Sequence, residues 1–360
     1  MTSATTKIPS GIDDVDAQWV TAVLRTHRTM PNTLVINDIR AEQIALDSGF
    51  SARLYRLHLT GDGGAPDSVI VKLPADEGAR MAMEMLGGYT REVNFYAKVA
   101  GRAPIGTPEV FLAQMAQDST NFVLVLEDLS AWENVDYLTG MTLERARACL
   151  AQLAGLHAWS ASPANADVVA SFPSMDVEMM RELLPGAFGM GWQLYRDAAT
   201  APIPPAVEEF AQDFVRHAPV ALKALTERST LVHGDFRADN MFFADGRLKV
   251  VDFQFAARGA GAADVAYLLG QGLPTVLRSG LDEELLTDYL GHLAERGVHD
   301  YSFDAAWRDY RFAVGYQLAL PVVALLGAAA MPERARLLCM TLIERAVATF
   351  DDIDAGQVFG

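Results

Sequence analysis

The chain has 360 residues, of which 51% are hydrophobic, and this is enough to build two lobes with sizeable cores. Its formal net charge is −17, from 29 basic and 46 acidic residues, which argues against nucleic acid or an anionic membrane surface as a partner. The longest apolar candidate for a membrane span, residues 319–331, is too short and contains Pro321. Because the N-terminus shows no secretory pattern, and Cys149 and Cys339 have the apolar contexts of core thiols, we expect a cytoplasmic protein.

The first third of the chain predicts a helix followed by a small antiparallel sheet. Apolar residues recur at helical spacing over Val15–His27, after an Asp13–Asp14 pair that is suited to capping the helix. Five alternating or apolar runs then read as strands, and the turn-rich GDGGAPD joins the second to the third. The predicted strands are Leu34–Ile44, Ser51–Thr60, Ser68–Leu73, Val110–Met115 and Phe122–Leu126.

Lys72 interrupts the apolar run VIVKLP of the third predicted strand. A charged residue in such a run is unexpected unless it is paired or points into a site, although a solvent-facing lysine on an alternating strand is the plain alternative. A helix is predicted over Thr90–Val99, with Thr90 as its cap, and it carries Glu92. Glu84 precedes it in a helical stretch that Gly87 and Gly88 interrupt.

The remainder of the chain reads as mostly helical. Thr142–Trp159 is the first helix, and its His157 is either a buried structural histidine or a catalytic one. The Met- and aromatic-rich segment Phe172–Ala199 is open to two interpretations, a pair of core helices or the wall of a substrate pocket. Further helices are predicted at Pro204–Thr226, Asp282–Arg296, Phe303–Leu326 and Pro332–Phe350.

The segment LVHGDFRADNMFF, residues 231–243, carries the strongest chemical signal in the chain. Two short apolar runs flank a loop with Asp235 and Asn240, and Asp252 ends the next apolar run, LKVVDFQF. One carboxylate is placed to orient an attacking hydroxyl, while an amide and a second carboxylate suit a hard metal ion, and phosphoryl transfer needs these parts. Taken alone, HGD is also a polar turn and Asn240 a turn former.

The pattern HxDxxxxN…DF resembles the catalytic and metal-binding loops of the protein-kinase-like superfamily. It is most similar to the aminoglycoside phosphotransferase and choline or ecdysteroid kinase-like enzymes, in which HGD replaces HRD. The resemblance implies an α+β bilobal fold, with a small antiparallel sheet and one main helix in an N-terminal lobe, residues 1–127. A larger, mostly helical C-terminal lobe, residues 128–360, would hold the catalytic loop and the acceptor pocket.

The resemblance also implies roles for individual residues. Asp235 would accept or orient the proton of the acceptor hydroxyl, and Asn240 and Asp252 would hold Mg²⁺. Lys72 would bind the phosphates of ATP, or of GTP, with a glutamate of the following helix holding it in place. Glu92 is preferred to the alternative, Glu84, because Glu92 to Tyr96 resembles the family's Glu-x-x-x-Tyr segment. The other predicted nucleotide contacts are Ser48, Gly49 and Ser51 in a short glycine turn, and Glu127 and Leu129 at the hinge between the lobes.

Three further residues follow the resemblance less directly. Arg237 would contact the γ-phosphate or the acceptor, and a salt bridge to Asp239 or another loop carboxylate is the alternative. His233 would brace the loop. Asp264, ahead of an apolar helix, would steady the loop through hydrogen bonds, or act near the start of that helix as an N-cap does.

We therefore expect an ATP-dependent kinase of a small hydroxylated molecule. FRAD stands where many aminoglycoside kinases carry Leu-His-Pro-Gly, and DFQ where others have DW or DFG, so the motifs leave the acceptor open. The segment Phe172–Tyr195 and the helix around Trp307–Gln317 favour a largely apolar alcohol, such as a steroid, polyketide or lipid-like hydroxyl. The alternatives are an aminoglycoside-type kinase, a hydroxyacyl-CoA kinase and a nucleotide-binding scaffold without turnover; the sequence says nothing of the oligomeric state.

Overall fold

The computed structural model describes residues 7–45, 52–117 and 121–360. The chain divides into two compact units, which we describe separately. Unit 1 comprises residues 1–102, 107–133 and 249–255, and unit 2 comprises residues 103–106, 134–248 and 256–360. The predicted division between residues 127 and 128 stays a prediction.

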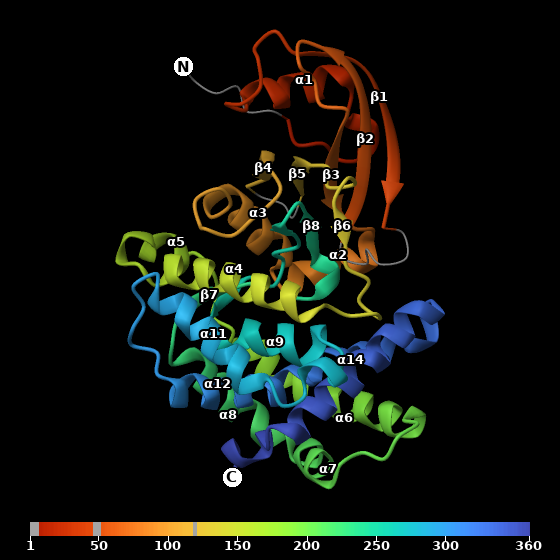
Figure 1. Cartoon of the computed structure of the whole chain (residues 1–360). Coiled ribbons are helices and arrows are strands. Elements are labelled where there is room, and N and C mark those ends of the chain that lie inside the picture. The colour runs from red at the N-terminus through yellow and green to blue at the C-terminus, as the bar shows by residue number, and fades with distance from the viewer. Residues whose placement is uncertain (1–6, 46–51, 118–120) are drawn as a thin grey trace. The chain divides into compact units, whose positions relative to one another are not determined.

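Unit 1 is built on a five-stranded antiparallel sheet in the order β1-β2-β3-β5-β4 (Figure 1). Its strands match those predicted from the alternating runs to within a few residues. The elements of this unit are η1 (Ile12–Asp14), α1 (Ala17–Thr26), β1 (Val35–Ile44), β2 (Ala52–Asp62), β3 (Ser68–Pro74), α2 (Glu77–Met85), α3 (Gly88–Lys98), β4 (Val110–Met115) and β5 (Phe122–Glu127).

The central strand β3 directs its side chains to the two faces of this sheet. Val69, Val71 and Leu73 are buried in one apolar cluster with Val20 and other residues of α1. Because side chains alternate along a strand, Lys72 points to the opposite face. The sheet therefore buries its apolar side under α1 and turns the lysine to the side of α3.

Two predicted helix caps in unit 1 are wrong. The α1 cap is Asp16, whose carboxylate accepts a hydrogen bond of 2.7 Å from the Trp19 N–H, rather than the Asp13–Asp14 pair. Asp13 and Asp14 lie instead in a short 3₁₀ turn. Thr90 lies within α3, which begins two residues earlier after Gly87, and Gly87 has the left-handed conformation that glycine favours.

Unit 2 is helical apart from short strands, and in Figure 1 its helices run from yellow-green to blue. Strands β7 and β10 pair antiparallel, and β6, β8 and β9 form the third sheet of the chain. The strands are β6 (Glu133–Asn134), β7 (Thr230–Val232), β8 (Met241–Ala244), β9 (Arg247–Val250) and β10 (Ala257–Gly259). The helices are α4 (Leu143–Ala161), η2 (Pro163–Asn165), α5 (Ala166–Ala170), α6 (Glu178–Ala198), α7 (Pro205–Gln212), α8 (Phe214–Thr226), η3 (Ala238–Asn240), α9 (Ala262–Gly272), α10 (Thr275–Arg278), α11 (Asp282–Ala294), α12 (Phe303–Gln317), α13 (Ala319–Ala324), η4 (Leu325–Ala330), α14 (Glu333–Asp352) and η5 (Ala355–Val358).

The single long helix predicted over Pro204–Thr226 is wrong, because the helix is broken at Asp213 into α7 and α8. The stretch Phe303–Ala329 is long and apolar enough to cross a membrane, with a mean hydropathy of 1.8, but 61% of its apolar window is buried inside the protein. A core helix passes the same test of length and composition. Cys149 and Cys339 are buried free thiols, as the sequence predicted.

Candidate active site

In unit 1, Lys72 lies between two carboxylates. Its Nζ donates hydrogen bonds of 2.7 Å to Glu92 Oε1 and 3.2 Å to Asp252 Oδ1. The Lys72 and Glu92 side chains are buried, whereas the Asp252 side chain is 22% exposed. The structure thus selects Glu92 over Glu84, which pairs with Arg80 on its own helix.

The charges of this cluster shift each other's pKa values. Burial lowers the pKa of Lys72, but the carboxylates of Asp252 and Glu92 outweigh it, so the pKa of Lys72 lies above its usual value. Burial raises the pKa of Glu92 to about 7, against the opposing effect of Lys72. Lys72 is therefore held as a cation beside the Asp252 carboxylate, which is partly exposed to solvent. A cation suited to phosphate next to a carboxylate suited to a metal ion is the charge pattern that phosphates and a metal ion together require.

The position of Asp252 is fixed by the residue that follows it. Phe253 is fully buried, and its ring stacks on Phe95 of α3 with 3.4 Å between the ring centroids. Asp252 itself has φ of 68°, a left-handed conformation that costs free energy in a residue other than glycine. The aromatic anchor on α3 therefore holds a strained aspartate beside Lys72.

The predicted hinge residues have structural partners within unit 1. Glu127 accepts a hydrogen bond of 2.8 Å from the Glu109 N–H and pairs with Lys249, while Leu129 is buried. Between them, Asp128 accepts hydrogen bonds from Arg56 and Ser68. The predicted phosphate turn, Ser48, Gly49 and Ser51, lies outside the described residues.

In unit 2, the loop that follows β7 is held by Asp264 of α9. The Asp264 carboxylate accepts hydrogen bonds of 2.7 Å from the His233 N–H and 2.9 Å from the Gly234 N–H. His157 Nε2 lies 3.2 Å from the same carboxylate, and His157 Nδ1 lies 2.8 Å from the hydroxyl of Tyr289. A carboxylate only accepts, so Nε2 carries a proton, and the contact of Nδ1 with the Tyr289 hydroxyl engages the other ring nitrogen. This arrangement corresponds to the structural interpretation of His157.

Asp235 and Asn240 lie together in this loop. The Asn240 side-chain N–H₂ donates to the Asp235 carbonyl at 3.0 Å and to Asp235 Oδ2 at 3.4 Å. The amide oxygen of Asn240 takes no part in these two hydrogen bonds. That oxygen is a ligand of the kind that Mg²⁺ prefers. No group of three His, Cys, Asp or Glu side chains within the described residues could hold a metal. The amide oxygen of Asn240 and, in unit 1, the partly exposed carboxylate of Asp252 are each oxygen donors of the kind that fits Mg²⁺.

Arg237 forms salt bridges with carboxylates of its own loop, which the sequence analysis gave as the alternative to a contact with the γ-phosphate or the acceptor. Its Nε lies 3.1 Å from Asp235 Oδ1 and 3.4 Å from Asp239 Oδ1. Burial lowers the pKa of Arg237, but the two carboxylates outweigh it, so the guanidinium stays charged. A contact of Arg237 with phosphate or acceptor stays a prediction.

Two tyrosines beside Asp235 were not found from the sequence. Tyr267 of α9 donates a hydrogen bond to the Asp235 carboxylate, and burial, together with that carboxylate, raises the pKa of Tyr267 well above its usual value. Tyr137 lies near the charges of Arg237, Asp239 and Asp235, and its buried hydroxyl has no hydrogen-bond partner in the described part of the chain. Such a hydroxyl costs about 1–3 kcal/mol. Neither tyrosine stands in a local motif, so no spacing rule points to them.

The predicted acceptor walls pack into the core of unit 2. Phe188 and Trp192 of α6 are buried, and Phe188 stacks on Phe214 of α8 with 3.9 Å between the ring centroids. Trp307 likewise stacks on Tyr310, and Tyr310 is fully buried. These contacts correspond to the core-packing interpretation of the segment.

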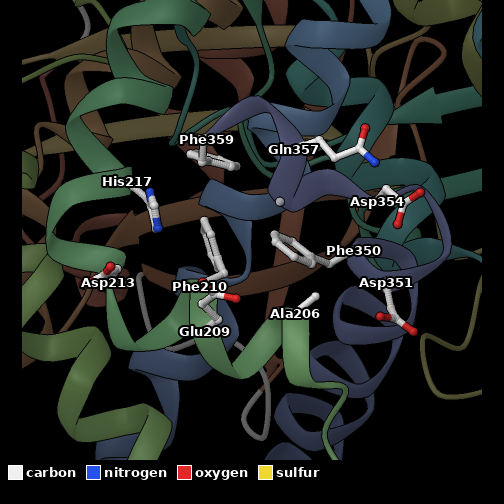
Figure 2. Close-up of a pocket in the computed structure, with 12 residues that line it drawn as sticks. Ala206, Glu209, Phe210, Asp213, His217, Phe350, Asp351, Asp354, Gln357 and Phe359 are labelled. Carbon is white, nitrogen blue, oxygen red and sulfur yellow. The ribbon is translucent and has the colours of Figure 1, made fainter.

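A pocket of about 370 Å³ lies among α7, α8, α14 and η5 (Figure 2). Its floor is aromatic, and the ring of His217 lies parallel to that of Phe210 at 5.1 Å between the centroids. No predicted site residue lines it, so it is separate from the loop that carries Asp235. Its other lining residues include Phe350, Phe359, Glu209, Asp213, Asp351 and Asp354.

Comparison with known proteins identifies the family. The sequence profile of the ecdysteroid kinase-like family matches residues 48–299, more than half of the chain. The chain belongs to this family. The bilobal α+β fold and the assignment to small-molecule kinases, both predicted from the motifs, are therefore confirmed at the level of the family.

Solved structures agree on the fold of this ecdysteroid kinase-like protein. A choline kinase from Cryptosporidium parvum is 12% identical with a TM-score of 0.55, and the match covers 95% of this chain and 97% of that one. An aminoglycoside phosphotransferase-like protein from Ralstonia eutropha is 16% identical with a TM-score of 0.52, over 93% and 97% of the two chains. The GDP complex of an aminoglycoside 2'-phosphotransferase-IIIa variant is 16% identical with a TM-score of 0.54, over 93% and 98%.

One curated relative matches in part. Acyl-CoA dehydrogenase family member 10 of the mouse is 39% identical over 98 residues, which make up 25% of this chain and 9% of that protein. A quarter of this chain thus matches a small part of a much longer relative.

Proposed function

We propose that this protein transfers the γ-phosphate of ATP to a hydroxyl group of a small molecule, with Mg²⁺ as cofactor. The observation that supports this most is Lys72, held as a cation by Glu92 at 2.7 Å and by Asp252 at 3.2 Å. A buried ion pair is a weak source of stability, so a lysine kept charged in this way suits a functional role. GTP is the alternative donor, because the phosphotransferase with a TM-score of 0.54 was solved with GDP.

In this mechanism each residue has one task. Asp235 accepts or orients the proton of the acceptor hydroxyl while the hydroxyl oxygen bonds to the γ-phosphorus, and the bond from that phosphorus to the β-phosphate oxygen breaks to release ADP. Lys72 neutralises phosphate charge, and Glu92 keeps Lys72 in place. Asn240 and Asp252 would hold Mg²⁺, which draws charge from the phosphates when it is bound.

The remaining predicted contacts complete the nucleotide site. Main-chain groups near Glu127 and Leu129 would hold the base, and the glycine turn of Ser48, Gly49 and Ser51 would approach the phosphates. Titration calorimetry with ATP and GTP, each with and without Mg²⁺, tests this part. We expect binding that Mg²⁺ strengthens, and the absence of binding to either nucleotide would end the kinase proposal.

For the acceptor we propose an uncharged alcohol with a largely apolar body. The sequence favoured this class, and α6 still exposes Leu183, Met190 and Leu194 although its aromatic residues are buried. The local match to the mouse acyl-CoA dehydrogenase family member adds hydroxyacyl thioesters as a second candidate. A cytoplasmic location stays an expectation.

An ATP-consumption screen over steroids, macrolides, hydroxyacyl thioesters and aminoglycosides tests the acceptor. Each hit is then repeated at low and high salt. Capture by charge weakens with salt, whereas capture by apolar contact holds or strengthens. Salt-sensitive turnover of an aminoglycoside, with no response to the apolar alcohols, would refute the apolar class while leaving the kinase activity in place.

A further inference from the structure

The hydroxyl of Tyr137 is buried near the Asp235 carboxylate, and it forms no hydrogen bond with the described residues. The residue is 4% exposed, and its oxygen has no hydrogen-bond partner among the residues that the structure describes. The charged groups that act on it are Arg237, Asp239 and Asp235, together with Arg345. Buried hydroxyls of tyrosine ordinarily find a partner, so a free one beside a catalytic group points to a ligand that supplies it.

The main chain of Tyr137 is fixed in place. Arg345 of α14 donates hydrogen bonds to the carbonyl oxygens of Tyr137 at 3.0 Å, of Leu138 at 2.8 Å and of Gln271 at 3.1 Å. Gly140 completes the turn with φ of 78°, and a Cβ there would meet Pro274 at 2.7 Å. The tyrosine is therefore held before any ligand binds, which lowers the entropic cost of using it.

The neighbours of Tyr137 are already engaged. Tyr267 donates to Asp235, and Arg237 lies in ion-pair distance of Asp235 and Asp239. The charges that act on the hydroxyl, Arg237 and Arg345 against Asp235 and Asp239, balance, so charge does not decide between a neutral and an anionic ligand group. What Tyr137 offers to a ligand is a neutral O–H donor, and such a donor binds an acceptor oxygen.

We propose that Tyr137 is a specificity-determining residue whose hydroxyl donates a hydrogen bond to a second oxygen of the acceptor. This oxygen, an ether, hydroxyl or carbonyl, must lie close enough to the hydroxyl that takes the phosphate for one molecule to reach both Asp235 and Tyr137 at hydrogen-bond distance. The inference rests on the proposed kinase function and narrows its substrate class.

Four small alcohols test this directly as phosphate acceptors at high concentration. 2-Methoxyethanol and 1-butanol have the same shape and differ by one oxygen in place of one CH₂, and 3-methoxy-1-propanol and 1-pentanol form a second such pair. Each has one hydroxyl, so the product is unambiguous by ³¹P NMR. With Mg-ATP we expect the ether alcohol of at least one pair to be phosphorylated about tenfold faster than its partner, because a polar group left unpaired penalises the alkyl analogue.

Tyr137→Phe should reduce that ratio to about one. Tyr301→Phe is the matched control, since Tyr301 is also buried but donates to Asp309, and this variant should keep the wild-type ratio. A wild-type ratio near one in both pairs, or a ratio that Tyr137→Phe leaves unchanged, would overturn the inference.

Thermal unfolding supplies a second measurement that needs no acceptor. Tyr137→Phe removes a hydroxyl that has no partner, so the unfolding temperature should hold or rise, whereas Tyr301→Phe should lower it by leaving Asp309 without its donor. An equal loss in both variants would make Tyr137 a structural residue.

If the protein neither binds nor consumes ATP, the kinase function itself fails. If it hydrolyses ATP in a manner that depends on Asp235 but phosphorylates none of the four alcohols, the inference alone fails.

Discussion

In unit 1, Lys72 lies between Glu92 and Asp252, and in unit 2, Arg237 lies between Asp235 and Asp239, so each unit holds one cation between two carboxylates. The ammonium of Lys72 has three donors, and the two contacts to carboxylates leave one for a further anion. Arg237 instead forms its ion pairs within its own loop, where Asp235 is the group with chemistry to perform. The first cluster therefore keeps a donor for a ligand anion, whereas the cation of the second is engaged within its own loop.

The largest expected effect comes from changing the reactive carboxylate of the second cluster. Asp235→Asn keeps the size of the side chain but cannot take a proton, so kcat should fall by about 10²–10⁴. Calorimetry should show nearly unchanged ATP affinity, because the proposed mechanism assigns Asp235 to the acceptor rather than to the nucleotide. A near-normal rate in the variant would mean that another group carries this role.

The next largest effect should follow removal of the cation from the first cluster. Lys72→Met leaves Glu92 and Asp252 without their partner, and deleting one member of a buried pair costs about 3–5 kcal/mol. We expect the free energy of unfolding to fall by about this amount at pH 8, and ATP binding to weaken. Lys249→Met is the control, because the Lys249–Glu127 pair is partly exposed and such pairs contribute about 0–1 kcal/mol.

The loss in Lys72→Met should depend on pH. Burial raises the pKa of Glu92 from 4.5 to about 7 while Lys72 lowers it, so without Lys72 the folded-state pKa rises further. A raised carboxyl pKa contributes stability that is present below the unfolded value and is lost as pH rises through the folded value. Denaturant unfolding at steps from pH 5 to pH 8 should show the variant nearest to wild type at pH 5, and the opposite trend would contradict this account.

The first cluster could be predicted from the sequence because its signals are local. A lysine in an apolar strand, a glutamate on the next helix and an aspartate at the end of a strand each stand out in a short window. The structure brings Lys72, Glu92 and Asp252 together as those patterns indicated. The strands of the sheet were also predictable, because β1 to β5 alternate or are fully apolar.

The second cluster was only half predictable. The motif places Asp235, Arg237 and Asn240 in one loop, but Tyr137, Tyr267 and Arg345 come from three other segments that meet through tertiary packing alone. Local patterns also failed where packing decides the outcome: the helical periodicity of residues 204–226 continues across the break at Asp213. The aromatic residues of α6 looked suited to bind a ligand, yet Phe188 and Trp192 are buried.

A smaller effect should come from the support behind the second cluster. Gly261 has an ordinary helical backbone, but a Cβ there would lie 2.3 Å from the Tyr289 hydroxyl and 2.5 Å from His157 Nδ1. Gly261→Ala should displace the residues that hold Asp264, and overpacking of this kind costs about 1–3 kcal/mol. In Gly189→Ala, by contrast, a Cβ meets nothing within 4 Å, so this α6 variant should gain about 0.5–1 kcal/mol from helix propensity. Equal changes in the two variants, measured by denaturant unfolding, would refute the steric argument.

The smallest expected effect separates the two tyrosines of the second cluster. Tyr267 donates to Asp235, whereas Tyr137 donates to no residue in the described part of the protein. Tyr267→Phe removes one neutral hydrogen bond from the carboxylate, worth about 0.5–1.5 kcal/mol, so kcat should fall roughly twofold to tenfold. KM for ATP should not change, because the lost contact orients Asp235 and touches no nucleotide group. The variant should also slow transfer to 2-methoxyethanol and to 1-butanol by the same factor, since orienting the base affects every acceptor alike. A change in their ratio would show that Tyr267 contacts the acceptor itself and shares the role proposed for Tyr137.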